Sequence, residues 1–244
     1  MKKLGLRPLV LGVSLIIAFI LWTFLVKTID VKLSPITSTP IGFATLNLWF
    51  HNLTGVYMTL YTITDWLGLV PICVCLIFGG IGLSQWIKRK CLFHVDYDII
   101  ILGGYYIVIV ACYLLFEYIT INYRPIFING YLESSYPSST TLLVFSVMPA
   151  LSFYVNHHIC RPLTKNLMRG LTNLFIAFMI LARLISGVHW LTDIIGSVLL
   201  CGGLFFMYKG IILLLKDQST SFNTLPMTKR TGFRSNSATQ LSYS

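Results

Sequence analysis

Six long apolar stretches constrain this chain more than any other feature of its sequence. A helix needs about 20 mostly apolar residues to cross the hydrocarbon core of a bilayer. Of the 244 residues, 56% are hydrophobic and only 11% are charged, whereas a soluble domain carries roughly 25% charged residues. The sequence therefore predicts an all-α polytopic membrane protein, a six-transmembrane helix bundle with spans at about residues 8–26, 66–87, 98–117, 140–158, 171–187 and 193–215.

Two further segments complete the predicted layout. Residues 43–62 are aromatic and amphipathic, with regularly placed Thr and Asn, which is typical of an additional interfacial helix lying on the membrane. Residues 217–244 are rich in Ser, Thr and Asn and lack apolar periodicity, which predicts a disordered cytoplasmic tail. The expected organisation is therefore one membrane domain, residues 1–216, followed by this tail.

The net charge of +10 is explained by membrane topology, so no nucleic-acid partner is expected. Three Lys or Arg residues lie before the first span, three in the second loop, three in the fourth loop, and five in the last span and tail, which makes 14 of the 18. Cytoplasmic loops carry the excess of Lys and Arg. Both termini are therefore expected in the cytoplasm, loops one, three and five are expected to face outward, and a bacterial plasma membrane is the expected location.

Two arginines on the predicted outer side, Arg124 and Arg183, run against this charge bias. Ionisable residues at membrane depth indicate function by default. The same outer segments also supply a carboxylate, a hydroxyl-rich helix start and a His–Asp pair: Glu117, residues 135–141 (SYPSSTT), His189 and Asp193. Taken singly, each feature has a structural alternative such as a helix end or an N-cap, but the combination favours a site.

This combination suits an oxyanion. Arginine forks bind phosphate oxygens through paired hydrogen bonds, and a helix N-terminus offers free N–H groups and the positive end of its dipole. Ser138, Ser139 and Thr140 would lie beside those N–H groups. His189 and Asp193 share a helical face if the sixth span begins there, so the carboxylate can hold the imidazole in one tautomer. An oriented histidine is a candidate nucleophile or base.

The pattern resembles the type 2 phosphatidic acid phosphatase superfamily, whose motifs are Lys-x6-Arg-Pro, Pro-Ser-Gly-His and Ser-Arg-x5-His-x3-Asp. The third motif matches best, through Arg183, His189 and Asp193, with Ala182 in place of the leading Ser. Order, spacing and predicted topology agree with the family over about residues 60–215.

The first two motifs match in part. Arg124-Pro125 is kept, with Glu117 where the family has Lys. Pro137-Ser138 is also kept, with Ser139 for Gly and Thr140 for His.

The resemblance implies a membrane lipid phosphatase that hydrolyses a lipid phosphate or diphosphate on the outer face, with no metal or other cofactor. His189 would attack phosphorus and form a phosphohistidine, and Asp193 would orient and charge it. The phosphoryl oxygens would be held by Arg124, Arg183, Ser138, Ser139 and Thr140. The alternatives are a lipid phosphotransferase and a non-catalytic lipid-phosphate binding or transport protein.

The two departures predict consequences. Thr140 is a poor acid, and an alkoxide whose conjugate acid has a pKa near 15.7 needs a proton, whereas a departing phosphate has a second pKa of about 6. A lipid diphosphate, such as an undecaprenyl-type carrier, is therefore the favoured substrate. Glu117 has three open interpretations: it pairs with Arg124, it is protonated and replaces the missing acid, or it marks a site that has lost turnover.

Overall fold

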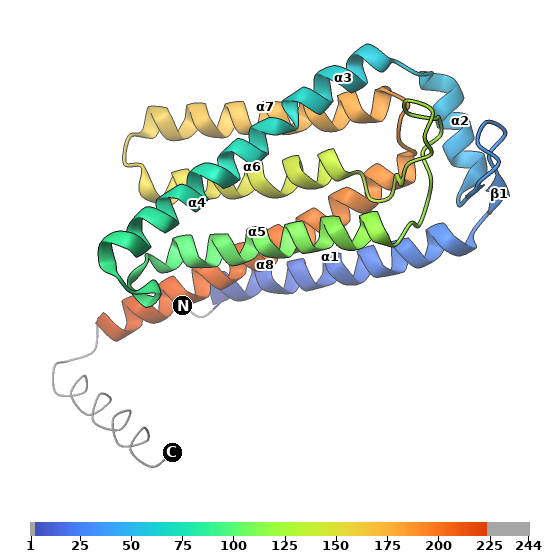
Figure 1. Ribbon diagram of the computed structural model, residues 1–244. Coiled ribbons are helices and arrows are strands. Elements are labelled where there is room, and N and C mark those ends of the chain that lie inside the picture. The colour runs from blue at the N-terminus through green and yellow to red at the C-terminus, as the bar shows by residue number, and fades with distance from the viewer. Residues whose placement is uncertain (1–2, 224–244) are drawn as a thin grey trace.

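The computed structural model describes residues 3–223, which form a bundle of long helices with a small hairpin at one end (Figure 1). The elements in chain order are α1 (Lys3–Thr28), β1 (Lys32–Leu33), β2 (Pro40–Ile41), α2 (Ala44–Thr54), α3 (Met58–Leu67), α4 (Leu69–Arg89), η1 (Leu92–His94), α5 (Tyr97–Tyr118), α6 (Ser139–His158), α7 (Pro162–Ile185) and α8 (Leu191–Asn223). The described chain contains six helical stretches that are long and apolar enough to cross a membrane: Leu4–Thr28, Met58–Arg89, Tyr97–Tyr118, Ser139–His158, Pro162–Ile185 and Leu191–Asp217. The predicted six-span helical fold is confirmed, and the chain is an integral membrane protein.

The segment predicted as one interfacial helix, residues 43–62, is divided between two helices. α2 ends at Thr54, where Gly55 adopts a φ of 73°, a conformation that glycine takes without steric cost. α3 then leads into α4, and the second span becomes Met58–Arg89. It starts two turns before the predicted position because the apolar side chains of α3 continue those of α4.

The last helix is also longer than predicted. α8 continues to Asn223, so residues 217–223 are helical although they were assigned to the tail. Extending an existing helix is far easier than nucleating a new one, which carries α8 past the end of the apolar stretch. The rest of the predicted tail, residues 224–244, lies outside the described residues.

α1 and α8 lie side by side along the bundle (Figure 1). A Cβ atom on Gly12 would lie 2.7 Å from the backbone nitrogen of Met207 and 2.8 Å from the carbonyl oxygen of Gly203. On Gly210 it would lie 2.9 Å from the backbone nitrogen of Leu9. Glycine therefore permits the close approach of the two backbones, and such small residues promote helix association in lipid.

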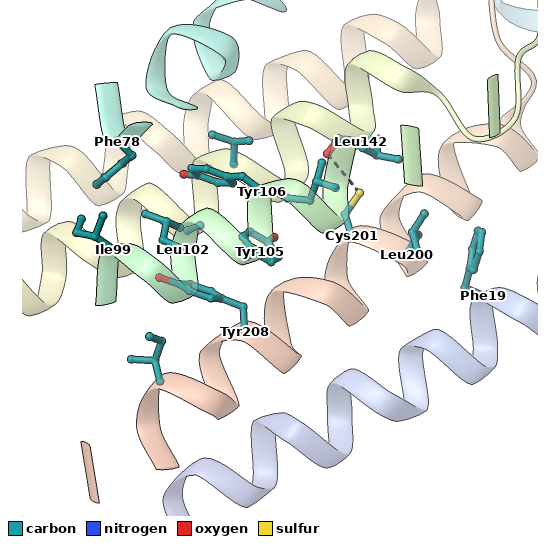
Figure 2. Close-up of a cluster of buried hydrophobic side chains, with 14 of the residues drawn as sticks. Phe19, Phe78, Ile99, Leu102, Tyr105, Tyr106, Leu142, Leu200, Cys201 and Tyr208 are labelled. Carbon is teal, nitrogen blue, oxygen red and sulfur yellow. Dashed lines mark hydrogen bonds between the residues drawn. The ribbon is translucent and has the colours of Figure 1, made fainter. Parts of the chain in front are cut away.

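Aromatic and aliphatic side chains from several helices fill the interior (Figure 2). The rings of Tyr105 and Tyr208 stack with their centroids 4.8 Å apart, and the Tyr105 hydroxyl donates to the carbonyl of Ser146 at 3.0 Å. The Cys201 thiol donates to the carbonyl of Leu142 at 3.4 Å. These contacts hold α6 between α5 and α8, which determines the position of the start of α6.

One end of the bundle, here called the site end, collects α2, the hairpin, and the loops that join α5 to α6 and α7 to α8 (Figure 1). The N–H of Tyr57 donates to the carbonyl of Ser186 at 3.0 Å. The indole N–H of Trp190 donates to the carbonyl of Tyr123 at 2.8 Å. Three loops far apart in sequence therefore meet at this end, as the topology argument requires, while the start of α1 and the end of α8 lie at the opposite end.

Candidate active site

Arg183, near the end of α7, is held from several sides, and only 1% of its side chain is exposed. Its Nη2 donates to Oδ1 of Asp65 at 3.1 Å and also to Oγ1 of Thr140. Its Nη1 donates to the carbonyl of Tyr61 at 3.4 Å, and the guanidinium lies 4.8 Å from the centre of the Tyr61 ring. Its Nε has no partner in the described structure, and because buried polar groups are normally paired, this N–H can serve a ligand.

Arg124 lies in the loop between α5 and α6, with 8% of its side chain exposed. Its Nη2 pairs with Oε2 of Glu133 at 3.1 Å, and its backbone N–H donates to the carbonyl of the same residue at 3.1 Å. Its guanidinium lies 5.7 Å from the centre of the Tyr61 ring. Nε and Nη1 are buried and have no partner within residues 3–223. Tyr61 therefore contacts both arginines, each of which keeps at least one buried N–H group unpaired.

His189 lies in the turn between α7 and α8, and its hydrogen bonds define its tautomer. Nδ1 is 3.1 Å from the carbonyl oxygen of Ser135 and 3.9 Å from Oδ2 of Asp193. A carbonyl oxygen can only accept, so Nδ1 carries the hydrogen and Nε2 carries a lone pair. Nε2 is buried and has no partner among the described residues.

The imidazole of His189 is neutral at pH 7. Burial, followed by the charges of Arg124 and Arg183, holds the pKa of His189 well below its usual value. A neutral imidazole with a free Nε2 lone pair is the form that a nucleophile requires.

Asp193, in the first turn of α8, is fully buried. Its Oδ2 accepts the backbone N–H of Trp190 at 2.9 Å, and its Oδ1 accepts from the Asn122 side-chain amide at 3.3 Å. The Asp193 carboxylate therefore links the loop between α5 and α6, which contains Arg124, to the turn between α7 and α8, which contains His189. α8 begins at Leu191, so His189 lies just before the helix and does not share a helical face with Asp193, yet the two side chains come within 3.9 Å.

A glycine closes this turn against the connection between α2 and α3. Gly187 has a φ of 71°, and a Cβ atom there would lie 2.0 Å from the carbonyl oxygen of Gly55. Both the left-handed conformation and the close approach of the two backbones exclude a larger residue. The turn therefore packs directly against the connection between α2 and α3.

The hydroxyl-rich segment before α6 lies at the same place. Ser138 is the N-cap residue of α6, and its Oγ accepts from the Thr141 hydroxyl at 3.1 Å. Thr140 accepts from Arg183, so its side chain positions that arginine. Ser139 lines a neighbouring pocket. The first N–H groups of a helix have no acceptor within the helix, so the backbone here offers donors.

A pocket of about 190 Å³ opens beside Arg124, lined by Tyr113, Phe116, Glu117, Arg124, Glu133, Ser134, Tyr136, Pro137, Ser139 and Leu142. The interpretation in which Glu117 pairs with Arg124 was wrong. α5 ends at Tyr118, so the two residues do not lie on one helical face, and Arg124 pairs with Glu133 instead. Glu117 is an exposed part of the pocket wall.

Sequence reasoning missed five residues that build this site: Tyr61, Asp65, Asn122, Glu133 and Ser135. Asp65 carried a usable signal, because it is the single acidic residue between positions 43 and 87 and ionisable residues in apolar segments indicate function. Ser135 carried none, because its contribution is a backbone carbonyl.

The fold and the site define a polytopic helical membrane protein in which two buried arginines lie at the same end of the bundle as an oriented histidine. Residues 99–214 match the model of the PAP2 superfamily. The crystal structure of a transmembrane PAP2-type phosphatidylglycerolphosphate phosphatase from Bacillus subtilis is similar in fold, with a TM-score of 0.50, 19% identity, and coverage of 83% of this chain and 96% of that chain. A comparison with curated proteins finds no match.

Proposed function

We propose that this protein is a membrane lipid phosphatase that cleaves a lipid phosphate or diphosphate through a phosphohistidine intermediate. The observation that carries the proposal is the state of His189. Its Nδ1–H donates to the Ser135 carbonyl at 3.1 Å, and its buried Nε2 has no partner in residues 3–223. The family match over residues 99–214 supports phosphatase chemistry, and this region contains both the histidine and the two arginines.

The phosphoryl group would lie among the unpaired donors. Nε of Arg183 and Nε and Nη1 of Arg124 are buried and have no partner in the described part of the chain, and guanidinium groups suit phosphate oxygens. The backbone N–H groups at the start of α6, from Ser139 onward, would complete the binding. Such sites act by positioning the reactants and by stabilising developing negative charge.

In the first step Nε2 of His189 would attack phosphorus as the bond to the leaving oxygen breaks. The ring would become a cationic phosphoimidazolium, which Asp193 stabilises from 3.9 Å. Water would then release phosphate and restore the neutral imidazole. The site end would face outward, as the distribution of Lys and Arg predicts.

The leaving group sets a condition on the substrate. The Thr140 hydroxyl accepts from Arg183 and is a poor acid, so a simple alkoxide would leave slowly. A diphosphate leaves as a phosphate whose second pKa is about 6 and needs little protonation. An undecaprenyl-type diphosphate therefore meets the condition, and so does a lipid phosphate that supplies its own proton.

The proposal is tested with purified protein in detergent micelles and two labelled lipids, a polyprenyl diphosphate and a phosphatidate. We expect phosphate release and an acid-labile, base-stable phosphoprotein, both of which His189→Ala lowers by roughly 10³-fold or more. His157→Ala is the matched control, because His157 is exposed and its Nδ1 contacts the Phe153 carbonyl at 2.8 Å, at the opposite end of the bundle. Turnover that does not depend on His189 would refute the mechanism, and absence of turnover would favour a lipid-phosphate binding protein.

A further inference from the structure

The second step of the proposed reaction needs a base that the residues considered so far do not supply. Water must attack phosphorus as the bond to Nε2 of His189 breaks, and a group close to that water has to accept one of its protons. Asp193 is not placed to do so, because it contacts the ring at Nδ1, whereas the reaction takes place at Nε2. Thr140 accepts a hydrogen bond from Arg183, and a hydroxyl group is a poor base.

Asp65 has the chemistry and the position that such a base requires. Nη2 of Arg183 donates both to Oδ1 of Asp65, at 3.1 Å, and to the hydroxyl of Thr140, so the carboxylate and the hydroxyl share one donor. The second oxygen of Asp65, Oδ2, forms no hydrogen bond or ion pair within residues 3–223. The side chain is 59% exposed, so a proton taken from water can leave to solvent.

α3 holds Asp65 in this position. Asp65 and Tyr61 are four residues apart and therefore lie on one face of the helix. The centre of the Tyr61 ring lies within 5.7 Å of both buried guanidinium groups, so this face is turned toward the two proposed phosphate ligands. Just beyond α3, a Cβ atom on Gly68 would lie 3.3 Å from the Thr140 methyl, and the end of the helix therefore packs closely against the start of α6.

Two other carboxylates at this end of the bundle, Glu117 and Glu133, are less well placed. Both line the pocket beside the start of α6, and the residues that line this pocket include neither Arg183 nor His189. Among the carboxylates of the described chain, Asp65 is the one that pairs with Arg183. Asp65 is therefore the strongest candidate for a base on the Arg183 side of the site.

We propose that Asp65 is the general base of the second step, where it orients the attacking water and takes its proton. This inference rests on the proposed function and names a catalytic residue of the same site. Asp65 lies outside residues 99–214, which match the family model, so the match itself assigns it no role.

The atoms and charges of this step balance. The water oxygen would bond to phosphorus, one water proton would pass to Oδ2 of Asp65, and the electron pair of the breaking P–N bond would return to Nε2 of His189. The products are a neutral imidazole, a phosphate dianion and a protonated Asp65, which then loses its proton to solvent.

The first step does not need Asp65 in this role. An ionised carboxylate paired with an arginine accepts protons and has none to donate. A leaving phosphate, whose second pKa is about 6, requires little protonation. Loss of the carboxylate should therefore slow the hydrolysis of phosphohistidine and leave its formation nearly unchanged.

The test follows the two steps separately in purified protein, with farnesyl diphosphate labelled on its terminal phosphate. Asp65→Asn keeps an oxygen that can accept from Arg183 but provides no base. We expect it to slow the loss of label from the phosphoprotein by about 10²-fold or more. Formation of the phosphoprotein should stay within about threefold of the native rate, so more phosphoprotein should be present at steady state. Asp65→Ser, which also lacks a base, should behave in the same way.

Three comparisons distinguish a base from a merely structural contact. Asp65→Glu keeps a base and should hydrolyse the phosphoprotein at a rate within about 10-fold of the native rate. Glu133→Gln makes the same chemical change beside Arg124 and should not raise the amount of phosphoprotein. Hydroxylamine attacks phosphorus as a neutral amine and needs no base, so it should cleave the phosphoprotein of Asp65→Asn as fast as that of the native protein.

The possible results separate this inference from the proposed function. Equal slowing of both steps by Asp65→Asn would overturn the inference, because the carboxylate would then only hold Arg183 in place. Unchanged loss of label, a phosphoprotein that resists hydroxylamine, or accumulation in Glu133→Gln instead would also overturn it, and each of these results leaves the phosphatase proposal intact. Phosphate release by the native protein without a phosphoprotein, or no release from either farnesyl diphosphate or phosphatidate, would overturn the proposed function, and the role of Asp65 with it.

Discussion

Replacing Asp193 with asparagine tests the charge of the His–Asp pair and keeps the hydrogen bond from Trp190, at the cost of the 3.3 Å bond from the Asn122 amide to Oδ1. An amide oxygen can still accept the backbone N–H of Trp190, which lies 2.9 Å from Oδ2 in the native protein. The carbonyl of Ser135 still holds Nδ1–H of His189 at 3.1 Å. The substitution therefore preserves the tautomer of His189 and removes one negative charge.

The size of the effect follows from the separation of the pair. Nδ1 of His189 and Oδ2 of Asp193 are 3.9 Å apart. At an effective dielectric of about 20, a unit charge pair at this distance is worth roughly 4 kcal/mol. The attraction arises only when the imidazole becomes charged, so it lowers the barrier and not the energy of the free enzyme. We expect Asp193→Asn to lower kcat by about 10³-fold, with KM nearly unchanged.

The assay is phosphate release from lipid micelles, with kcat and KM determined separately and with the phosphoprotein trapped in alkali. Asp217→Asn is the matched control, because it makes the same change near the other end of α8. Thermal unfolding in detergent should show that both variants remain folded. A kcat for Asp193→Asn within a factor of about three of the native value would refute the electrostatic role.

Three further predictions follow from the geometry. Thr140→His restores the family residue but should not restore an acid, because the site has no room for the larger ring: the Thr140 methyl lies 3.3 Å from the position of a Cβ on Gly68. Overpacking should cost about 1–3 kcal/mol of stability and should lower both Tm and activity. A gain of activity would contradict this view. Tyr61→Leu should raise KM about threefold to tenfold by removing the ring from beside both arginines, whereas Tyr61→Phe should not; equal KM values in the two variants would exclude the ring contact. Burial and the two arginines lower the pKa of His189, so the imidazole stays neutral as pH falls through 6.5. We therefore expect kcat/KM to stay level there and to decline only at lower pH. A loss of activity that begins at or above pH 6.5 would count against a buried neutral His189.

Much of the fold could be predicted because its cause is local. Spans of sufficient length and apolarity must be helical in lipid, since each backbone group needs a partner within the segment. The six helices are accordingly recognisable from residue types alone, and the largest differences are at the starts of the second and fifth spans, which begin at Met58 and Pro162 and not at residues 66 and 171. The second span was placed late because residues 58–65 were assigned to a separate interfacial helix, whereas α3 leads into α4 and the span begins at Met58.

In the candidate site, too, some residues could be proposed from the sequence, whereas the role of another was misjudged. Arg124, Arg183, His189 and Asp193 were chosen as candidates because a charged or polar residue at the end of an apolar span is conspicuous. Arg183 and Asp193 are only ten residues apart and lie on either side of the turn between α7 and α8. The role of Glu117 was misjudged in one interpretation because that interpretation assumed a helix continuing past Tyr118.

The sequence by itself determined that this chain is a six-span membrane protein that carries a motif similar to those of lipid phosphatases. The length of an apolar stretch and the spacing of nearby residues are both local properties of the sequence. The tertiary structure decided which atoms meet: Tyr61 with both arginines, Thr140 with Arg183, Ser135 with His189, and Glu133 with Arg124. These contacts join residues from different helices and loops, and one of them uses a backbone carbonyl that every residue type possesses. Such contacts depend on how the helices pack against one another, which cannot be predicted from a local sequence pattern.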